Sequence, residues 1–355
     1  MTANPTPVTP TFERRARLAW QIWLDGELGH GPLALAEGCV VVVARPEGSG
    51  GCEVVRLDDD GARVWALGLE DRVMGPPVRS EGLIAVPTEG GVAVVSLGGA
   101  LRRVIALPGR PIGSLVALGG RLWARLEPLD GGGVRRLVSV PLDGSAQPLL
   151  SEDPLGEAGP ARWRRTNQTI CLAAQREADG AGAGGELRLV GLDERTAAPL
   201  WQRRIECAGL SDLWAAGGLL DVATADRVMS FDARTGTPLT TRFVGLPLAQ
   251  ARIAGETLIT VQPANHGGLR INAYECAFEV LRGALTGAKR VLGAGSDLLA
   301  LEPPGAPLAL FELPELQRLT LREADALHDP RALTFARSRV WVVGHGGKSL
   351  SALDV

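Results

Sequence analysis

A repeated unit runs along most of the chain, and this repetition constrains the possible fold more than any other feature. Each copy contains an apolar strand, a turn, a second strand ending in Leu-Asp or Phe-Asp, a polar turn, and a strand with a large side chain. The clearest copies are residues 54–65, 189–201 and 229–240. Asp193 and Asp232 occupy the same place in the last two copies, where a carboxylate can accept hydrogen bonds from the amides of the turn that follows. Such a repeat predicts strand units that stack side by side.

Weaker copies of the same unit fill the remaining sequence. They begin near residues 82, 121, 256, 297 and 339. Together with the clear copies they give about eight units of about 42 residues, which is the length of a four-stranded propeller blade. The sequence therefore predicts an all-β fold, an eight-bladed β-propeller. Seven blades remain the alternative, because the repeat is blurred between Cys276 and Gly295.

The two ends of the chain complete one unit between them. The last unit ends at Asp354 without its Trp-bearing strand, whereas residues 16–24 form a strand with Trp20 but no unit of their own. Pairing the two ends closes the ring, and closure removes the exposed edges of an open sheet. We therefore expect residues 16–355 to form a single propeller domain, closed by an N-terminal strand that completes the C-terminal blade. Residues 1–15, rich in Pro and Thr, are predicted to be a disordered leader.

The composition supports a fold of many short strands and turns. Of the 355 residues, 46 are Gly and 24 are Pro, which is about a fifth of the chain and above average usage. Hydrophobic residues make up 45%, enough to fill a substantial core. Disorder, collagen and coiled coil are therefore excluded as the overall fold.

Four of the units carry the motif of a known family. The carriers are Leu57-Asp58 with Trp65, Leu192-Asp193 with Trp201, Phe231-Asp232 with Gly236, and Leu353-Asp354 with Trp20. At these residues the chain resembles the pyrroloquinoline-quinone-like (quinoprotein-like) β-propeller repeat family, which also includes the propeller of outer-membrane assembly lipoproteins. The resemblance spans nearly the whole chain from Ala16. It implies that Trp20, Trp65 and Trp201 pack between adjacent blades.

The resemblance in the repeat does not imply the active site of the quinoprotein dehydrogenases. Those enzymes are longer, and they have a vicinal cysteine pair, a calcium site and an Asp base around the quinone. No two cysteines are adjacent in this chain. We therefore expect no quinone and no redox activity. The competing WD40 propellers are disfavoured because no Trp-Asp dipeptide occurs.

Charge and cysteine usage predict the compartment and the partners. The net charge is −3, so no bulk positive field is present to hold nucleic acid or an anionic membrane. The five cysteines are widely spaced, odd in number and free of Cys-x-x-Cys pairs, which indicates reduced thiols. The N-terminus has no apolar signal-peptide region, and no apolar run approaches the ~20 residues of a membrane span. We expect a cytoplasmic protein with no nucleic-acid partner and no membrane insertion.

The sequence shows no catalytic or metal-binding motif. His30, His266, His328 and His345 are isolated along the chain, and no GxSxG motif occurs. Residues 58–61 read Asp-Asp-Asp-Gly, but they lack the remaining ligands of a calcium loop and coincide with a turn of the repeat. We expect no enzyme activity, no cofactor and no metal.

Four loops between the second and third strands of a unit are expanded: residues 45–51, 127–133, 176–185 and 263–268. In a propeller these loops share one face with the connections between blades, and insertions on one face often mark a binding face. Neutral drift in loop length is the alternative. The predicted partner-binding residues are Arg45, Glu47, Glu127, Asp130, Trp163, Arg176, Glu177 and His266. For Trp163 two interpretations stay open, an exposed interface anchor or an inward-turned ring on the innermost strand of the fourth blade.

The sequence thus favours a non-enzymatic protein-interaction scaffold or sensor subunit of a cytoplasmic multiprotein assembly. It would bind another protein of the same cell through loops on one propeller face. The alternative is a small-ligand or metal sensor, or an enzyme, with its site in the central funnel, where polar residues of several innermost strands converge.

Overall fold

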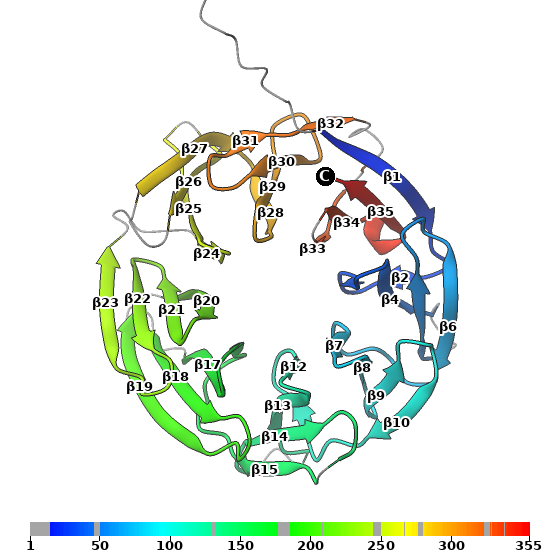
Figure 1. The fold of residues 1–355 in the computed structure, drawn as a ribbon, viewed down its shortest axis with the longest axis vertical. Coiled ribbons are helices and arrows are strands. Elements are labelled where there is room, and N and C mark those ends of the chain that lie inside the picture. Colours follow the sequence, from blue (N-terminus) through cyan, green and yellow to red (C-terminus); the bar gives the residue numbers. More distant parts are fainter. Residues whose placement is uncertain are drawn as a thin grey trace, which may run out of the picture.

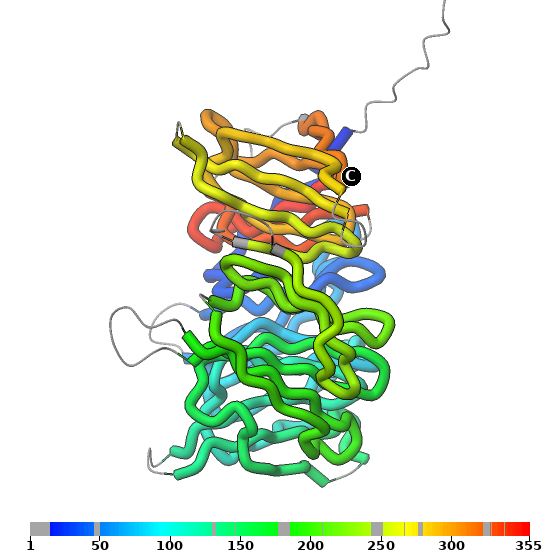
Figure 2. The backbone as a smooth tube through the Cα atoms, turned by 90° about the vertical axis from the view of Figure 1, so that its left-hand side faces the viewer, coloured from blue at the N-terminus to red at the C-terminus, as the bar shows by residue number. Residues whose placement is uncertain are grey.

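Eight antiparallel sheets are arranged in a ring, each standing as one blade around a common axis (Figure 1). The computed structural model describes residues 15–45, 50–129, 133–145, 147–176, 185–207, 209–243, 250–265, 267–275, 280–322, 327, 329–336 and 338–355. Seen edge-on in Figure 2, the strands run between the two faces of the ring. The eight-bladed β-propeller is therefore confirmed, and the seven-bladed alternative is not the fold.

The strands of each blade are named a to d from the axis outward. Blade 1 has β2 (Glu27–Leu28) and β3 (Leu33–Ala34) in the a position, then β4 (Cys39–Ala44), β5 (Cys52–Leu57) and β6 (Arg63–Leu69). Blade 2 has β7 (Val78–Ser80), β8 (Leu83–Thr88), β9 (Gly91–Ser96) and β10 (Leu101–Ile105). Blade 3 has β11 (Arg110–Pro111) and β12 (Val116–Leu118) in the a position, then β13 (Arg121–Glu127), β14 (Arg136–Pro141) and β15 (Leu149–Glu152). Blade 4 has β16 (Arg162–Thr166), β17 (Thr169–Arg176), β18 (Gly185–Asp193) and β19 (Pro199–Cys207).

The second half of the ring repeats this arrangement. Blade 5 has β20 (Leu210–Ala216), β21 (Leu219–Thr224), β22 (Arg227–Asp232) and β23 (Pro238–Phe243). Blade 6 has β24 (Gln250–Ala254), β25 (Thr257–Pro263), β26 (Leu269–Glu275) and β27 (Val280–Ala288). Blade 7 has β28 (Arg290–Ala294), β29 (Leu298–Glu302), β30 (Ala309–Glu312) and β31 (Gln317–Arg318). Blade 8 has β33 (Ala332–Ala336), β34 (Arg339–Gly344), the 3-10 turn η2 (His345–Gly347), β35 (Ser349–Asp354) and β1 (Arg15–Trp23), with β32 (Thr320–Arg322) beside β1.

The N-terminal strand closes the ring, as the sequence predicts. β1 pairs antiparallel with β35, from Arg17 opposite Asp354 to Trp23 opposite Ser349. β1 is thus the d strand of blade 8 (Figure 1). A feature that the repeat does not reveal is β32, which adds a fifth strand parallel to the start of β1.

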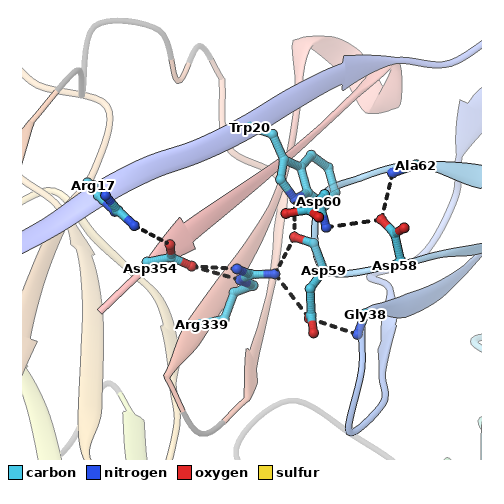
Figure 3. A network of polar contacts seen from close by, with 9 residues as sticks. All are labelled: Arg17, Trp20, Gly38, Asp58, Asp59, Asp60, Ala62, Arg339 and Asp354. Atoms are coloured by element: carbon cyan, nitrogen blue, oxygen red, sulfur yellow. Dashed lines mark hydrogen bonds and ion pairs between the residues drawn. The ribbon is translucent and has the colours of Figure 1, made fainter.

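Polar contacts fasten this closing blade to blade 1 (Figure 3). The Arg339 guanidinium donates to the Asp354 carboxylate through Nη2 at 2.6 Å, and to the backbone carbonyl of Asp59 through Nη1 at 2.6 Å. The Trp20 indole donates to the same carbonyl at 2.7 Å. The Asp59 carboxylate accepts from the Gly38 amide at 2.9 Å, which holds the turn in blade 1 in place. The first and last segments of the chain therefore converge on one turn.

The predicted packing of Trp side chains between blades is confirmed, and it follows one pattern. Each indole N–H donates to a backbone carbonyl in the c–d turn of the next blade: Trp20 to Asp59 at 2.7 Å, Trp65 to Leu97 at 2.8 Å and Trp201 to Ala233 at 2.9 Å. We call these three contacts the Trp latches. Each latch fixes one blade to its neighbour through both an apolar ring and a hydrogen bond.

Glycine lies beneath the rings because no side chain fits there. Gly99 and Gly236 have φ of +88° and +66°, and a Cβ would come within 2.7 Å of the Trp65 ring and 2.5 Å of the Trp201 ring. The Thr-Gly turn of the repeat is thus explained by turn geometry and by packing together. In blade 2 an arginine replaces the tryptophan, since Arg103 donates to the carbonyl of Pro141 across the same kind of junction.

The core lies between the blades rather than within them. A b or c strand is covered by a neighbouring blade on each face, so it carries a continuous apolar run instead of an alternating pattern. Residues 39–43 of β4 are all buried for this reason. Cys39, Cys52, Cys171 and Cys207 are free and buried, as predicted, and burial raises the pKa of Cys39 to about 12. Cys276 lies outside the described residues.

Replacing Trp201 with Ala should lower the free energy of unfolding by about 3–5 kcal/mol, because a large buried side chain and its hydrogen bond are lost together. Urea denaturation measures the change. The matched control is Leu200→Ala on the same strand, where the side chain is exposed and the change should stay within about 0.5 kcal/mol. Equal effects of the two substitutions would show that the latch does not hold blades 4 and 5 together.

A pH dependence follows from the c–d turns. The Asp232 carboxylate accepts from the Arg234 amide at 3.1 Å and from the amide and hydroxyl of Thr235 at 2.8 Å each, and these bonds lower its pKa below the ordinary value. A carboxyl whose pKa is depressed on folding stabilises the fold above its unfolded pKa of about 4, and this contribution disappears as the pH falls through the folded pKa. The stability advantage of the wild type over Asp232→Asn should therefore shrink below about pH 4. A difference in Tm that stays constant from pH 6 to about pH 2.5 would contradict this assignment.

Candidate functional site

One face of the ring carries the b–c loops and the d–a connections between blades, and we call it the loop face. The four loops predicted to be expanded all connect a b strand to a c strand, in blades 1, 3, 4 and 6. Blade 7 has a b–c connection of similar length, residues 303–308, which was not among the loops predicted to be expanded. The c–d turns on the opposite face are short except in blade 3, where residues 142–148 form a longer connection.

Three of the predicted partner-binding residues lie on the loop face at the ends of b strands. Arg45 directly follows β4, Glu127 ends β13 and Arg176 ends β17. Glu127 accepts a hydrogen bond from Arg135 at 3.3 Å, and Arg176 forms an ion pair with Glu157 at 3.4 Å. These residues belong to three different blades, so they share a face and not one local cluster. Glu47, Asp130, Glu177 and His266 lie outside the part of the chain that the structure describes.

Trp163 is an inward-turned ring on the innermost strand of blade 4, which was the second of the two interpretations from the sequence. It lies on β16, the innermost strand of blade 4, and its side chain is only 4% exposed. It packs in a cluster with Trp123 and Leu155. The side chain is therefore part of the core and is not an exposed interface anchor.

A groove of about 710 Å³ opens on the loop face between blades 2 and 3, and we call it the blade 2–3 groove. It is formed by the two d–a connections on either side of blade 2, the b–c turn of blade 2 and the b–c loop of blade 3. The lining residues are Met74, Thr88, Glu89, Gly90, Gly91, Leu107, Gly109, Arg110, Pro111 and Leu129.

The rim of this groove is open to solvent and combines two apolar side chains, Met74 and Leu129, with two exposed charged residues, Glu89 and Arg110. Met74 is 60% exposed and Leu129 is 72% exposed. Single exposed apolar side chains are common on protein surfaces, but two of them beside one groove form a surface that a partner can cover. Covering each side chain fully would contribute about 1.5–3 kcal/mol.

Backbone hydrogen bonds hold the walls of the groove in place. The Met74 amide donates to the Pro87 carbonyl at 2.9 Å, and the Ile112 amide donates to the Arg125 carbonyl at 2.7 Å. At Gly91, which has φ of +142°, a Cβ would collide with the carbonyl oxygen of Ile105. The connections are thus packed tightly against the strands, and a preformed surface loses little entropy when a partner binds.

A buried ion pair supports the loop face next to the groove. Arg125 on β13 donates to the Asp153 carboxylate at 2.8 Å, and both side chains are fully buried. Arg125 also donates to the Ala158 carbonyl at 2.9 Å, so it ties the connection between blades 3 and 4 to the centre of blade 3. Burial raises the pKa of Asp153, and the nearby guanidinium opposes that rise. Arg125 was not among the residues predicted from the sequence, although a single Arg inside an apolar strand is a visible signal.

Within the described ranges, no group of three or more His, Cys, Asp or Glu side chains is placed to hold a metal ion. A helix with the length and apolar character of a membrane span is likewise not found among those residues.

Comparison with known proteins supports the family resemblance. The family model described as outer membrane protein assembly factor BamB matches residues 11–145. The crystal structure of BamB from Moraxella catarrhalis is similar with a TM-score of 0.63 and 16% identity, covering 96% of this chain and 98% of that one. The Dos1 propeller is similar with a TM-score of 0.61 and 12% identity, covering 96% of this chain and 95% of that one. The chain matches none of the curated protein sequences.

These comparisons confirm the resemblance to quinoprotein-like propellers in repeat and in fold. At identities of 16% and 12%, the likeness to the two solved structures shows the fold alone.

The ion pair gives a test of how the loop face is supported. Arg125→Met should lower the free energy of unfolding by about 3–5 kcal/mol, because it leaves the Asp153 carboxylate buried without its partner. The double variant Arg125→Met/Asp153→Leu should recover part of this loss. Urea denaturation measures both changes.

The control is the solvent-exposed pair Arg63–Glu53, whose nitrogen and oxygen lie 2.8 Å apart. Arg63→Met should cost less than about 1 kcal/mol. An Arg125→Met variant as stable as the wild type would show that the buried pair does not support this face.

Proposed function

We propose that the protein is a non-enzymatic protein-interaction scaffold or sensor subunit of a cytoplasmic multiprotein assembly. Its partner is another protein of the same cell, which docks on the loop face at the blade 2–3 groove. The observation that carries this proposal is the pair of exposed apolar side chains, Met74 and Leu129, beside a preformed groove of about 710 Å³.

The architecture suits a binding role of this kind. The groove lies on the same face as the expanded loops, so a partner that covers it can also contact polar loop residues such as Arg45 and Glu127. An apolar centre with a polar rim is the usual anatomy of a protein interface. The similar protein BamB is named as an assembly factor, which fits a propeller that holds other proteins together.

The cytoplasmic location in this proposal rests on the cysteines. Cys39, Cys52, Cys171 and Cys207 are free and buried between blades. Free thiols in this number are typical of proteins in a reducing compartment. Fractionation of native cells, with detection of the protein in the soluble cytoplasmic fraction, tests the location independently of the partner.

Affinity purification of the tagged protein from its native cells, with mass spectrometry, tests the docking surface. The variant Met74→Asp/Leu129→Asp places two charges at the apolar positions of the rim, and it should reduce partner recovery at least about tenfold. The matched control is Leu219→Asp, because Leu219 is exposed and begins a b strand, at the opposite face of the ring.

The outcomes separate the parts of the proposal. Loss of a stoichiometric partner in the double variant alone supports both the scaffold and the groove. A partner retained in both variants contradicts the groove as the docking surface. Absence of any stoichiometric partner of the wild-type protein contradicts the scaffold itself.

A further inference from the structure

Three arginine side chains gather around one carboxylate on the innermost strands of blades 4, 5 and 6. Arg162 and Arg164 belong to β16, Asp212 to β20 and Arg252 to β24. Figure 1 shows β20 and β24 as neighbouring inner strands of the ring. All four residues line a cavity of about 500 Å³. We call this group the channel arginine cluster.

The central carboxylate does not satisfy the arginines around it. Arg162 Nη1 and Arg164 Nη2 lie 3.6 Å and 3.7 Å from Asp212 Oδ1, which is too far for direct hydrogen bonds. Asp212 instead accepts from two backbone amides, those of Leu213 at 2.8 Å and Ile253 at 3.0 Å. Both oxygens therefore already accept a backbone hydrogen bond, and the bond to Ile253 ties β20 to β24.

The cluster carries more positive than negative charge. Three guanidinium groups face one carboxylate, and guanidinium stays protonated at any physiological pH. Asp212 is only 12% exposed, and burial lowers the pKa of both Arg164 and Arg252. Arg162 and Arg164 share the single carboxylate in long ion pairs, and one negative charge does not balance three positive charges that are partly withdrawn from water, so an anion in this cavity would be favoured.

The guanidinium groups are also positioned to donate. Arg164 Nη1 donates a hydrogen bond to the carbonyl of Trp163 at 2.8 Å, which fixes the orientation of the guanidinium group. The other N–H groups of Arg164 take no part in that bond. No hydrogen bond joins the Arg252 guanidinium to another residue of the described ranges. Planar guanidinium groups bind the oxygens of phosphate and carboxylate in pairs.

We infer that the channel arginine cluster binds a small anion that carries phosphate or carboxylate groups. The cavity volume lies within the range of small-ligand sites. Arg162 and Leu210 begin β16 and β20 at the loop face, whereas Ala294 ends β28 at the opposite face, so the cavity lies along the innermost strands of the ring. This site lies in blades 4 to 6, apart from the blade 2–3 groove, and it does not depend on the proposed partner.

Thermal unfolding and calorimetric titration with inorganic phosphate, pyrophosphate and citrate test the inference. Sodium chloride at matched ionic strength is the reference, because it screens charge without offering oxyanions. At least one of the three anions should raise the Tm by about 3 °C or more at saturation, since it binds only the folded ring. A shift with phosphate or pyrophosphate alone assigns a phosphoryl ligand, and a shift with citrate alone assigns a carboxylate.

Substitutions locate the site. Arg164→Gln and Arg252→Gln should each weaken the Kd at least about tenfold. The matched control is Arg282→Gln, because Arg282 on β27 is 47% exposed and Arg164 is 43% exposed. Asp212→Asn removes the one negative charge, so it should tighten anion binding several-fold. If Arg164→Gln or Arg252→Gln does not fold, Arg162→Gln at the first residue of β16 tests the same site.

The inference is overturned if none of the three anions raises the Tm above the chloride reference. It is equally overturned if the arginine variants of the cluster bind the anion as tightly as the wild type and the Arg282→Gln control.

Discussion

The antiparallel pairing of β1 with β35 is the interaction on which the rest of the structure depends. Every blade buries its two faces against two neighbours, so an open array would leave apolar strands exposed at both ends. The pairing supplies the missing strand of blade 8, and Arg339 and Trp20 then fasten that blade to the turn at Asp59 (Figure 3). Similar contacts recur elsewhere in the ring, where Trp65, Arg103 and Trp201 tie blade 1 to blade 2, blade 2 to blade 3 and blade 4 to blade 5.

The two candidate surfaces exist only because blades are held at fixed positions. The blade 2–3 groove takes its walls from two blades and the connections beside them, and the channel arginine cluster takes its charges from three blades. Their chemistry differs. The groove has exposed apolar side chains on its rim suited to a protein surface, whereas the cluster has excess positive charge in a partly buried cavity suited to a small anion. A protein that uses both would hold a partner on the loop face at blades 2 and 3 and sense a ligand at the innermost strands of blades 4 to 6.

The sequence predicted the features that are local or periodic. The strand repeat, the turns at Asp193 and Asp232, and the complementary ends at Trp20 and Asp354 are visible in short stretches, and each is confirmed. Side-chain clusters built from several distant strands were missed. Arg162 and Arg252 lie far apart in the sequence, and they come near the same carboxylate only because the chain folds into a ring. Trp163 shows the limit for single residues, because the sequence left an exposed anchor and an inward-turned ring both open, and only the structure places the ring in the core.

The most direct test of this account is hydrogen exchange at β35 in the full chain and in a variant that lacks residues 1–23. If β1 closes the ring, the amides of residues 349–354 that face β1 are protected in the full chain and exchange like those of an exposed edge strand in the truncated protein, whereas the amides that face β34 keep their partners. Protection in blades 1 and 8 should fall as well, because the truncated protein loses the Trp20 hydrogen bond to Asp59 and keeps only the Arg339 contacts at that junction. Unchanged protection of β35 after truncation would show that the ring does not depend on its N-terminal strand.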